Sequence, residues 1–238
     1  MSKYLKPELI ISVDGEAATL AGSVFAIGAA VIECDTGRVV DRYMGRLTRS
    51  AIDKLNPGEF TKQNVIEPTI ERWKDIAFVT ESRHVLHAHF FAWWRCWVAG
   101  TTRMGVDSVL QHHCSASGGM NAVAISDVRT RVREARAYEG LLHGDEILTV
   151  ADWGFPVEQN LFFTAIQLSP DFEFFGPTPL HEISTLRLAA KLAAPRIAPT
   201  SQRYQSIGGV EHNPLDDAII SGLECEQILR ILRHAGQR

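Results

Sequence analysis

The first fifty positions of the chain consist of apolar runs separated by turn residues. Residues 9–13 are mostly apolar, and residues 24–33 (VFAIGAAVIE) form a longer run with several β-branched side chains. Short apolar runs bounded by turn residues are typical of buried strands, although periodicity alone does not distinguish them from a helix. Asp35-Thr36-Gly37 has the composition of a hairpin turn. The pattern therefore predicts three strands in a meander, over 9–13, 24–33 and 38–47.

The hydrophobic period changes to that of helices further along the chain. Apolar and aromatic side chains recur at helical spacing in residues 83–98, which predicts an amphipathic helix packed on the core. The last helix begins at a proline followed by two acids, because proline fits a first turn and carboxylates favour the positive end of a helix. The other predicted elements are a strand at 146–151, helices at 157–168, 180–193 and from Pro214 to Arg233, and a polar loop at 194–209.

The length and composition fit one domain with an insertion. The chain has 238 residues, of which 45% are hydrophobic and 22% are charged, so a normal core can be buried. We interpret residues 1–238 as a single domain, with a helical and loop insertion at about 99–140. The four cysteines are far apart and form no CxxC pair, so neither a disulfide framework nor a zinc ribbon is indicated.

The charge balance limits the kinds of partner that we expect. The formal net charge is −4, which disfavours broad non-specific binding to duplex nucleic acid but allows a grip on a few nucleotides with metal ions present. No run of 18 consecutive apolar residues and no signal-type segment is present. We therefore expect a cytoplasmic protein with no membrane partner, and a homo-oligomer is compatible with the sequence.

Acidic residues at the ends of predicted elements are the candidates for chemistry. Asp14 and Glu16 lie two apart on the first strand, so their side chains leave the same face. Two such carboxylates repel each other unless a cation lies between them, and the alternative is a polar strand end that leads into a loop. Asp152 ends a later strand, and His212 precedes Asp217 at the last helix. Carboxylates from separate elements are what Mg²⁺ or Mn²⁺ requires.

These motifs resemble those of the DEDDh 3′–5′ exonucleases. Asp14-Gly15-Glu16 matches the first motif, and the segment from His212 to Asp217-Ala218 matches the last. The resemblance implies an α/β, RNase H-like fold, with a mixed central sheet flanked by helices in which parallel strands join the antiparallel meander. The middle motif departs from the family pattern: Asp152 is the preferred middle acid, because its short side chain matches the usual ligand, and Glu158 at a helix start is the alternative.

The resemblance also implies a reaction. A 3′–5′ exonuclease would release nucleoside monophosphates from the 3′ end of single-stranded RNA or DNA, using two Mg²⁺ or Mn²⁺ ions per site. Asp14, Glu16 and Asp217 would hold the first ion, Asp14 and the middle acid would hold the second, and His212 would act as general base. The candidate substrate contacts are Phe25, Ile27 and Arg203, although core packing is the alternative for the first two.

Two other functions remain as alternatives. One is a phosphodiesterase that acts on short oligonucleotides or dinucleotides, which the acidic net charge favours. The other is a catalytically inactive nucleic-acid-binding module of the same fold, against which the complete set of acids and His212 argues.

Overall fold

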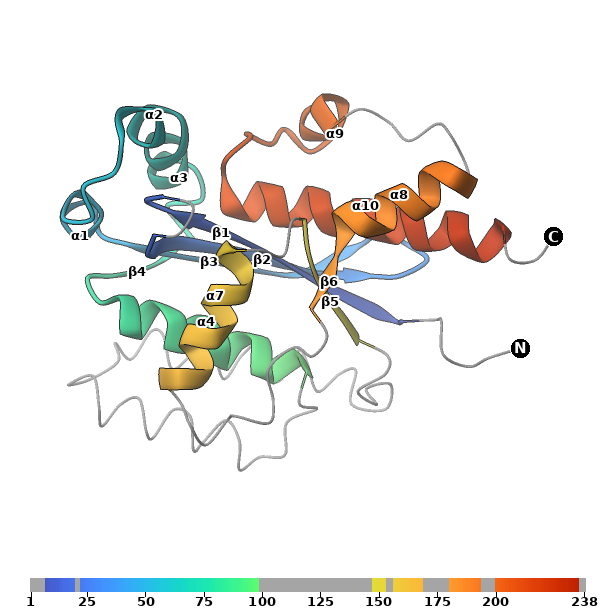
Figure 1. The fold of residues 1–238 in the computed structure, drawn as a ribbon, viewed down its shortest axis with the longest axis horizontal. Helices are drawn as coiled ribbons and strands as arrows, with labels where there is room; N and C mark the ends of the chain where they lie inside the picture. Colours follow the sequence, from blue (N-terminus) through green and yellow to red (C-terminus); the bar gives the residue numbers. More distant parts are fainter. Residues whose placement is uncertain are drawn as a thin grey trace.

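The β-branched apolar runs near the start of the chain form the centre of a six-stranded mixed sheet (Figure 1). The computed structural model describes residues 7–19, 22–98, 147–152, 156–168, 180–193 and 200–235. The predicted insertion at 99–140 lies outside the described residues. The strands are β1 (Leu9–Ala17), β2 (Val24–Glu33), β3 (Val39–Leu47), β4 (Phe78–Thr80), β5 (Ile147–Ala151) and β6 (His181–Glu182).

The strand order is β4-β3-β2-β1-β5-β6. Strands β1, β2 and β3 pair antiparallel as the predicted meander, whereas β4 joins β3, β5 joins β1 and β6 joins β5 in parallel. The turn between β2 and β3 places Asp35 and Gly37 at positive φ, as a tight hairpin connection requires. This mixed sheet flanked by helices, with parallel strands joined to the antiparallel meander, confirms the predicted α/β class.

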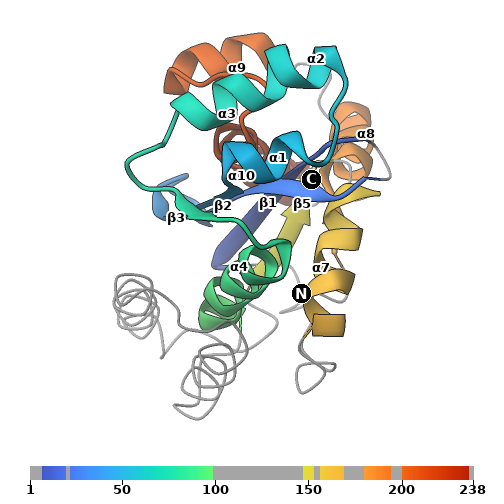
Figure 2. The ribbon, with the colours of Figure 1, turned by 90° about the vertical axis from the view of Figure 1, so that its left-hand side faces the viewer.

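Helices cover both faces of the sheet, as Figures 1 and 2 show. Helices α4 and α7 pack on one face, and α8 and α10 pack on the other. The helical segments are α1 (Arg49–Asp53), α2 (Glu59–Thr61), the π-helical turn η2 (Lys62–Ile66), α3 (Glu67–Glu71), α4 (Arg83–Val98), α7 (Val157–Leu168), α8 (Ile183–Ala193), α9 (Thr200–Ile207) and α10 (Pro214–Ala235). Among the described helices, none has the length and apolarity that crossing a membrane requires.

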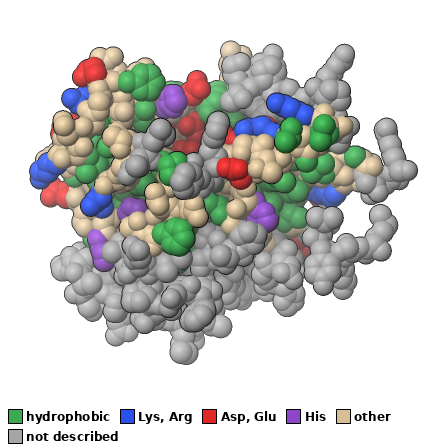
Figure 3. All heavy atoms as spheres, in the orientation of Figure 1, with side chains coloured by type: hydrophobic (Ala, Val, Ile, Leu, Met, Phe, Trp, Pro, Cys, Tyr) green, Lys and Arg blue, Asp and Glu red, His purple; other side chains and the backbone are tan. Residues whose placement is uncertain are grey.

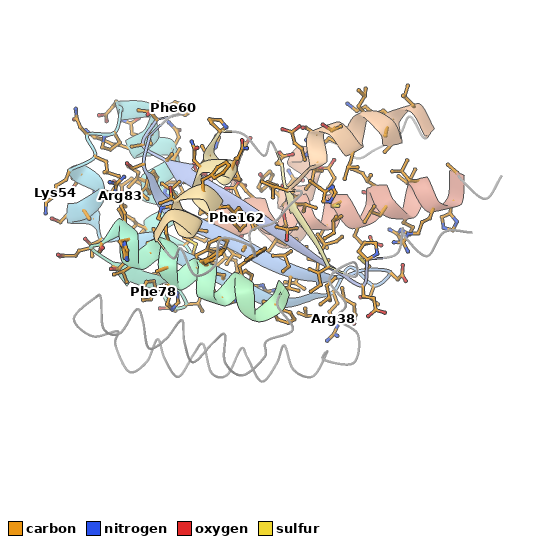
Figure 4. The ribbon with its side chains drawn as sticks, turned by 60° about the horizontal axis from the view of Figure 1, so that its bottom comes forward. Arg38, Lys54, Phe60, Phe78, Arg83 and Phe162 are labelled. Carbon is orange, nitrogen blue, oxygen red and sulfur yellow. The ribbon has the colours of Figure 1, made fainter. Side chains whose placement is uncertain are left out.

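The alternation of side chains along β1 supplies one core to each face. Leu9, Ile11 and Val13 pack toward α4 and α7, whereas Ile10 packs with residues of α8 and α10. Large aromatic side chains of α4 dominate the first core, and Figure 4 shows this side with Phe162 on α7, whose ring meets those of Phe90 and Trp94 of α4. The two cores hold the sheet rigidly between the helices, so the strand ends can position functional groups.

Helix α10 approaches the sheet more closely than a side chain would allow. A Cβ atom added to Gly28 of β2 would overlap the backbone of Pro214 and Leu215. A Cβ atom added to Gly222 would overlap the side chain of Ile32 and lie 2.9 Å from the Cβ of Ser12. Glycine at these two positions therefore lets the first turns of α10 lie directly on β1 and β2.

Several predicted boundaries are wrong. Strand β1 continues to Ala17 rather than ending at residue 13, because its pairing with β2 extends past the apolar run. Residues 200–207, predicted as loop, form α9, whose end is closed by a hydrogen bond from Gly209 N–H to Tyr204 O. The helix predicted at 180–193 starts only at Ile183, since residues 181–182 pair with β5 as a short strand.

Candidate active site

Two parallel strands bring Asp14 and Asp152 to one edge of the sheet. Strand β1 pairs with β5 up to Val13 and Ala151, and the next residue after each of these two is an aspartate. Glu16 follows on the same face of β1 as Asp14, at a point where the pairing with β2 shifts register. The edge therefore presents three carboxylates from two strands that are far apart in the sequence.

Helix α10 adds Asp217 to this edge. Asp217 lies in the first turn of α10. The start of α10 packs directly on Gly28 of β2, and Gly28 is the residue that pairs with Asp14 of β1. Asn213 begins the helix, since its Oδ1 accepts a hydrogen bond from Asp216 N–H at 3.3 Å. Asp217 Oδ1 accepts a hydrogen bond of 2.5 Å from the hydroxyl of Tyr204 on α9.

His212 lies in the turn before α10. Its φ of 62° is in the left-handed region, which few non-glycine residues adopt, and its side chain is exposed. Ligand atoms of Glu16, His212 and Asp217 lie within 4.8 Å of one another, close enough to hold one metal ion. The exposed side chain of Phe60, on α2, is labelled in Figure 4. Its ring lies beside the His212 imidazole, with 6.3 Å between the ring centroids.

The two candidates for the middle acid have different partners. Asp152 Oδ1 forms an ion pair of 2.7 Å with Nη2 of Arg187, a residue of α8 that also holds Glu224 through two hydrogen bonds of 2.7 Å. Glu158 lies in the first turn of α7, and its Oε1 accepts a hydrogen bond of 3.3 Å from Gly15 N–H. Among the described residues, no lysine or arginine forms an ion pair with Glu158.

The carboxylates raise one another's pKa values. Burial raises the pKa of Asp14 well above its usual range, and four neighbouring carboxylates raise it further. In decreasing order of effect, these carboxylates belong to Asp217, Glu16, Glu158 and Asp152. Burial also raises the pKa of Glu16, and it raises the pKa of Asp217 to about 7 although the Tyr204 hydrogen bond opposes the rise.

The acids and His212 line one open pocket of about 400 Å³. Figure 3 shows acidic side chains gathered next to a histidine on the upper part of the face in view. The described lining residues that carry polar side chains are Asp14, Glu16, Thr19, Asp152, Glu158, Tyr204, Glu211, His212, Asp217 and Ser221. Because the oxygens are hard donors and the acids repel one another, these residues fit a divalent cation such as Mg²⁺ or Mn²⁺.

The structure therefore brings together all the predicted catalytic and metal-binding residues, whereas the predicted substrate contacts Phe25 and Ile27 are not among the residues that line this pocket. Phe25 and Ile27 are fully buried in the core, so the alternative of core packing describes their environment. The side chain of Arg203 lies outside the described part of the chain. Their roles toward a substrate stay predictions.

Tyr204 and Glu211 line the pocket and Phe60 lies beside His212, although none of the three belongs to a motif of the predicted site. Tyr204 belongs to a segment predicted as loop, and Phe60 belongs to a segment without a clear hydrophobic period. Glu211, an exposed neighbour of His212, adds another carboxylate to the lining. The tertiary contacts identify these three residues, since no motif in the sequence marks them.

Comparisons with known proteins add a likeness of fold. No family model matches the sequence, and no curated protein matches it. Among solved structures, the chain is similar to the nuclease domain of 3′hExo, a DEDDh family member, which was crystallised bound to rAMP. The alignment covers 98% of this chain and 95% of that domain, with 9% sequence identity and a TM-score of 0.41. Function must therefore be argued from the residues of this chain.

Proposed function

We propose that this protein is a metal-dependent 3′–5′ exonuclease that releases nucleoside monophosphates from single-stranded nucleic acid. The observation that supports it is the convergence of Asp14, Glu16, Asp217 and His212 in one pocket, although Glu16 and His212 are 196 positions apart in the sequence. Buried carboxylates that repel one another are costly unless a cation offsets their charge. A histidine beside such a site is a suitable acceptor for the proton of a water molecule.

The residues divide into two sets of metal ligands. Asp14, Glu16 and Asp217 would hold one Mg²⁺ or Mn²⁺ ion, and Asp14 and the middle acid would hold a second. Two cations in such a site stabilise the attacking and leaving oxygens of an in-line displacement at phosphorus. The Tyr204 hydroxyl orients Asp217 by donating to its Oδ1.

The contacts favour Glu158 over Asp152 as the middle ligand, in contrast to the preference from the sequence. Arg187 already offsets the charge of Asp152, whereas Glu158 is oriented by a backbone N–H and has no such counter-ion among the described residues. Glu158 also raises the pKa of Asp14 more than Asp152 does, which indicates the stronger electrostatic contact with the shared ligand. Asp152 would then support the site through its ion pair.

His212 and the neighbouring Phe60 would act on the substrate. His212 would accept the proton of the attacking water, since its exposed side chain lies next to Glu16 and Asp217. The exposed ring of Phe60 offers a stacking surface for a base, as aromatic side chains do in proteins that bind single strands. No sequence-specific contact is required for either role.

A degradation assay on single strands tests the proposal. Single-stranded RNA and DNA labelled at the 5′ end should shorten stepwise with Mn²⁺ or Mg²⁺ and stay intact in EDTA. Asp14→Asn or Asp217→Asn should abolish release of mononucleotides, whereas Asp53→Asn, at an exposed ion pair with Arg49, is the matched control. Full activity of either site variant would contradict the proposal, and so would fragments cut internally.

Metal titration by calorimetry separates the two candidates for the middle acid. Glu158→Gln should lose one of two Mn²⁺ ions, whereas Asp152→Asn should keep both with weaker affinity because the Arg187 contact is disturbed. The reverse result would restore the assignment made from the sequence.

The net charge of −4 favours a second candidate, a phosphodiesterase for dinucleotides and short oligonucleotides. An acidic surface repels a long polyanion more strongly than a short one. Comparing kcat/KM for a dinucleotide and for a longer single strand distinguishes the two functions.

A further inference from the structure

The turn that carries His212 is joined to α3 by one buried carboxylate, that of Asp216. Asp216 is 0% exposed and lies in the first turn of α10, next to Asp217. Its Oδ1 accepts hydrogen bonds of 3.2 Å from the Trp73 indole and from Arg72 Nη2. Its Oδ2 accepts a hydrogen bond of 2.9 Å from Val210 N–H and forms an ion pair with Arg72 Nε. Every partner is a donor, so only a carboxylate satisfies them all.

The same residues hold the backbone around His212 in place. Arg72 Nη2 also donates to the carbonyl of Gly208 at 2.7 Å, so one guanidinium bridges the start of the turn and the first turn of α10. His212 and Trp73 both have positive φ, 62° and 60°, which is an unfavourable backbone conformation for a non-glycine residue. A turn with an unfavourable backbone conformation keeps one geometry only where surrounding contacts determine it.

None of these three side chains belongs to the described residues that line the pocket. Instead, they connect the turn at 208–213 to the end of α3 and to the start of α10. The guanidinium of Arg72 also lies 5.0 Å from the centroid of the Trp73 ring, so the donors around the carboxylate support one another. The cluster therefore reaches the site through the turn that carries His212.

We propose that Asp216, Arg72 and Trp73 form a positioning cluster that holds the His212 imidazole against Glu16 and Asp217. The inference rests on the proposed function of His212 as general base. The metal ligand Asp217 is held separately, by its place on α10 and by its hydrogen bond with Tyr204. Loss of the cluster should therefore displace His212 and leave the metal site in place.

Asp216→Asn and Trp73→Phe break the cluster to different degrees. The asparagine amide would place its NH₂ group against donors, whereas phenylalanine removes one indole N–H and keeps an aromatic ring. Trp97→Phe is the matched control, because it removes an indole N–H that donates to Asp41 at 2.9 Å on the opposite face of the sheet.

Kinetics test the inference first. Asp216→Asn should lower kcat by about tenfold or more, since small displacements of a reacting group have effects of this size, and KM and Mn²⁺ affinity should stay within about twofold. Trp73→Phe should lower kcat less, and Trp97→Phe should not change it. In the background of His212→Ala, Asp216→Asn should cause no further loss of kcat. A loss that multiplies with that of His212→Ala, or an unchanged kcat, would overturn the proposal.

A second measurement decides the question even if the protein shows no nuclease activity. In protein labelled with ¹³C at histidine, the His212 ring signal is identified by its disappearance in His212→Ala. Asp216→Asn should shift and broaden this signal, whereas Trp97→Phe should not affect it. A His212 signal that is the same in Asp216→Asn and in the wild type would overturn the positioning role, whatever the outcome of the degradation assay.

Discussion

The acids of this protein differ in whether a basic side chain offsets their charge. Asp216 and Glu224, both almost fully buried, accept hydrogen bonds from Arg72 and Arg187. Among the described residues, by contrast, no lysine or arginine forms an ion pair with the three acids at the centre of the pocket, Asp14, Glu16 and Asp217. Protonation or a cation from solution would offset their charge, and this contrast with Asp216 and Glu224 supports the proposed metal site.

Phe60 is the residue whose exposure predicts a role in substrate binding. Its ring is 67% exposed beside His212, although burial of such a ring would be favourable. Phe60→Ala should raise KM for single strands by about tenfold or more and change kcat little, because stacking a base is worth about 1–3 kcal/mol. Steady-state kinetics provide the measurement.

Phe163→Ala is the control for this prediction, since Phe163 is also exposed, at 54%, but lies on α7, whereas the ring of Phe60 lies beside that of His212. Equal increases in KM for the two variants would show that a general loss of apolar surface, rather than stacking beside His212, explains the effect.

His87 predicts a pH dependence of stability. Burial on α4 lowers its pKa from 6.5 to about 4, so the folded state binds fewer protons than the unfolded state between these values. The free energy of unfolding is therefore unaffected by this histidine above its unfolded pKa and decreases as the pH falls toward about 4. At pH ~5 the decrease amounts to about 2 kcal/mol.

Urea unfolding at pH values of about 7.5 and 5 measures this effect. In His87→Gln, which has no titrating ring, the free energy of unfolding should fall less on acidification than in the wild type. His234→Gln, at the exposed end of α10, is the control for the other titrating groups. A pH dependence that is identical in His87→Gln and the wild type would refute the prediction.

At the scale of elements, the close contact of α10 with the sheet is the feature on which the site depends. Gly28 lies under the backbone of Pro214, and its strand partner in β1 is Asp14. Gly28→Ala should push the start of α10 away from β2, lower the free energy of unfolding by roughly 2–4 kcal/mol and weaken Mn²⁺ binding. Chemical denaturation and calorimetry measure the two effects.

Gly58→Ala is the matched control, because nothing lies within 4 Å of an added Cβ there and φ is −65°. Its stability should change by less than about 0.5 kcal/mol. If Gly28→Ala were as stable as Gly58→Ala and bound Mn²⁺ normally, α10 would not depend on this contact for its position.

How well an element can be predicted from the sequence depends on which contacts stabilise it. Strand β2 and helices α4 and α7 were predicted with correct bounds, because apolar periodicity reports burial directly. Strands β4 and β6 have three and two residues, and their pairing partners β3 and β5 determine them. Helix α9 is mostly polar, and its contact with the site comes from the hydrogen bond of Tyr204 with Asp217. These contacts with distant parts of the chain cannot be predicted from the local sequence.

At the scale of the whole molecule, the topology explains why distant acids meet. Asp14 and Asp152 follow paired positions of parallel strands, Glu158 begins the next helix, and Asp217 is set on the sheet from the opposite end of the chain. The Asp-x-Glu pattern and the spacing from His212 to Asp217 indicated this convergence from the sequence alone. The partners of each acid, such as Arg187 for Asp152, emerge only from the folded arrangement, and they changed the preferred middle ligand.

Because the acids of the pocket converge, we expect the same residues that bind the metal ion to lower the stability of the metal-free protein. Without metal, the repulsion and burial that raise the pKa values of Asp14, Glu16 and Asp217 should lower the thermal stability. Asp217→Asn should therefore raise the metal-free Tm by the equivalent of about 1–2 kcal/mol, since its amide oxygen can still accept the Tyr204 hydrogen bond. Mn²⁺ should raise the Tm of the wild type, because it binds only the folded state, and should raise that of Asp217→Asn much less.

Differential scanning fluorimetry with and without Mn²⁺ provides the measurement, and Asp53→Asn should respond like the wild type. Equal Mn²⁺ responses in the wild type and Asp217→Asn would show that the acids of the pocket do not hold the ion.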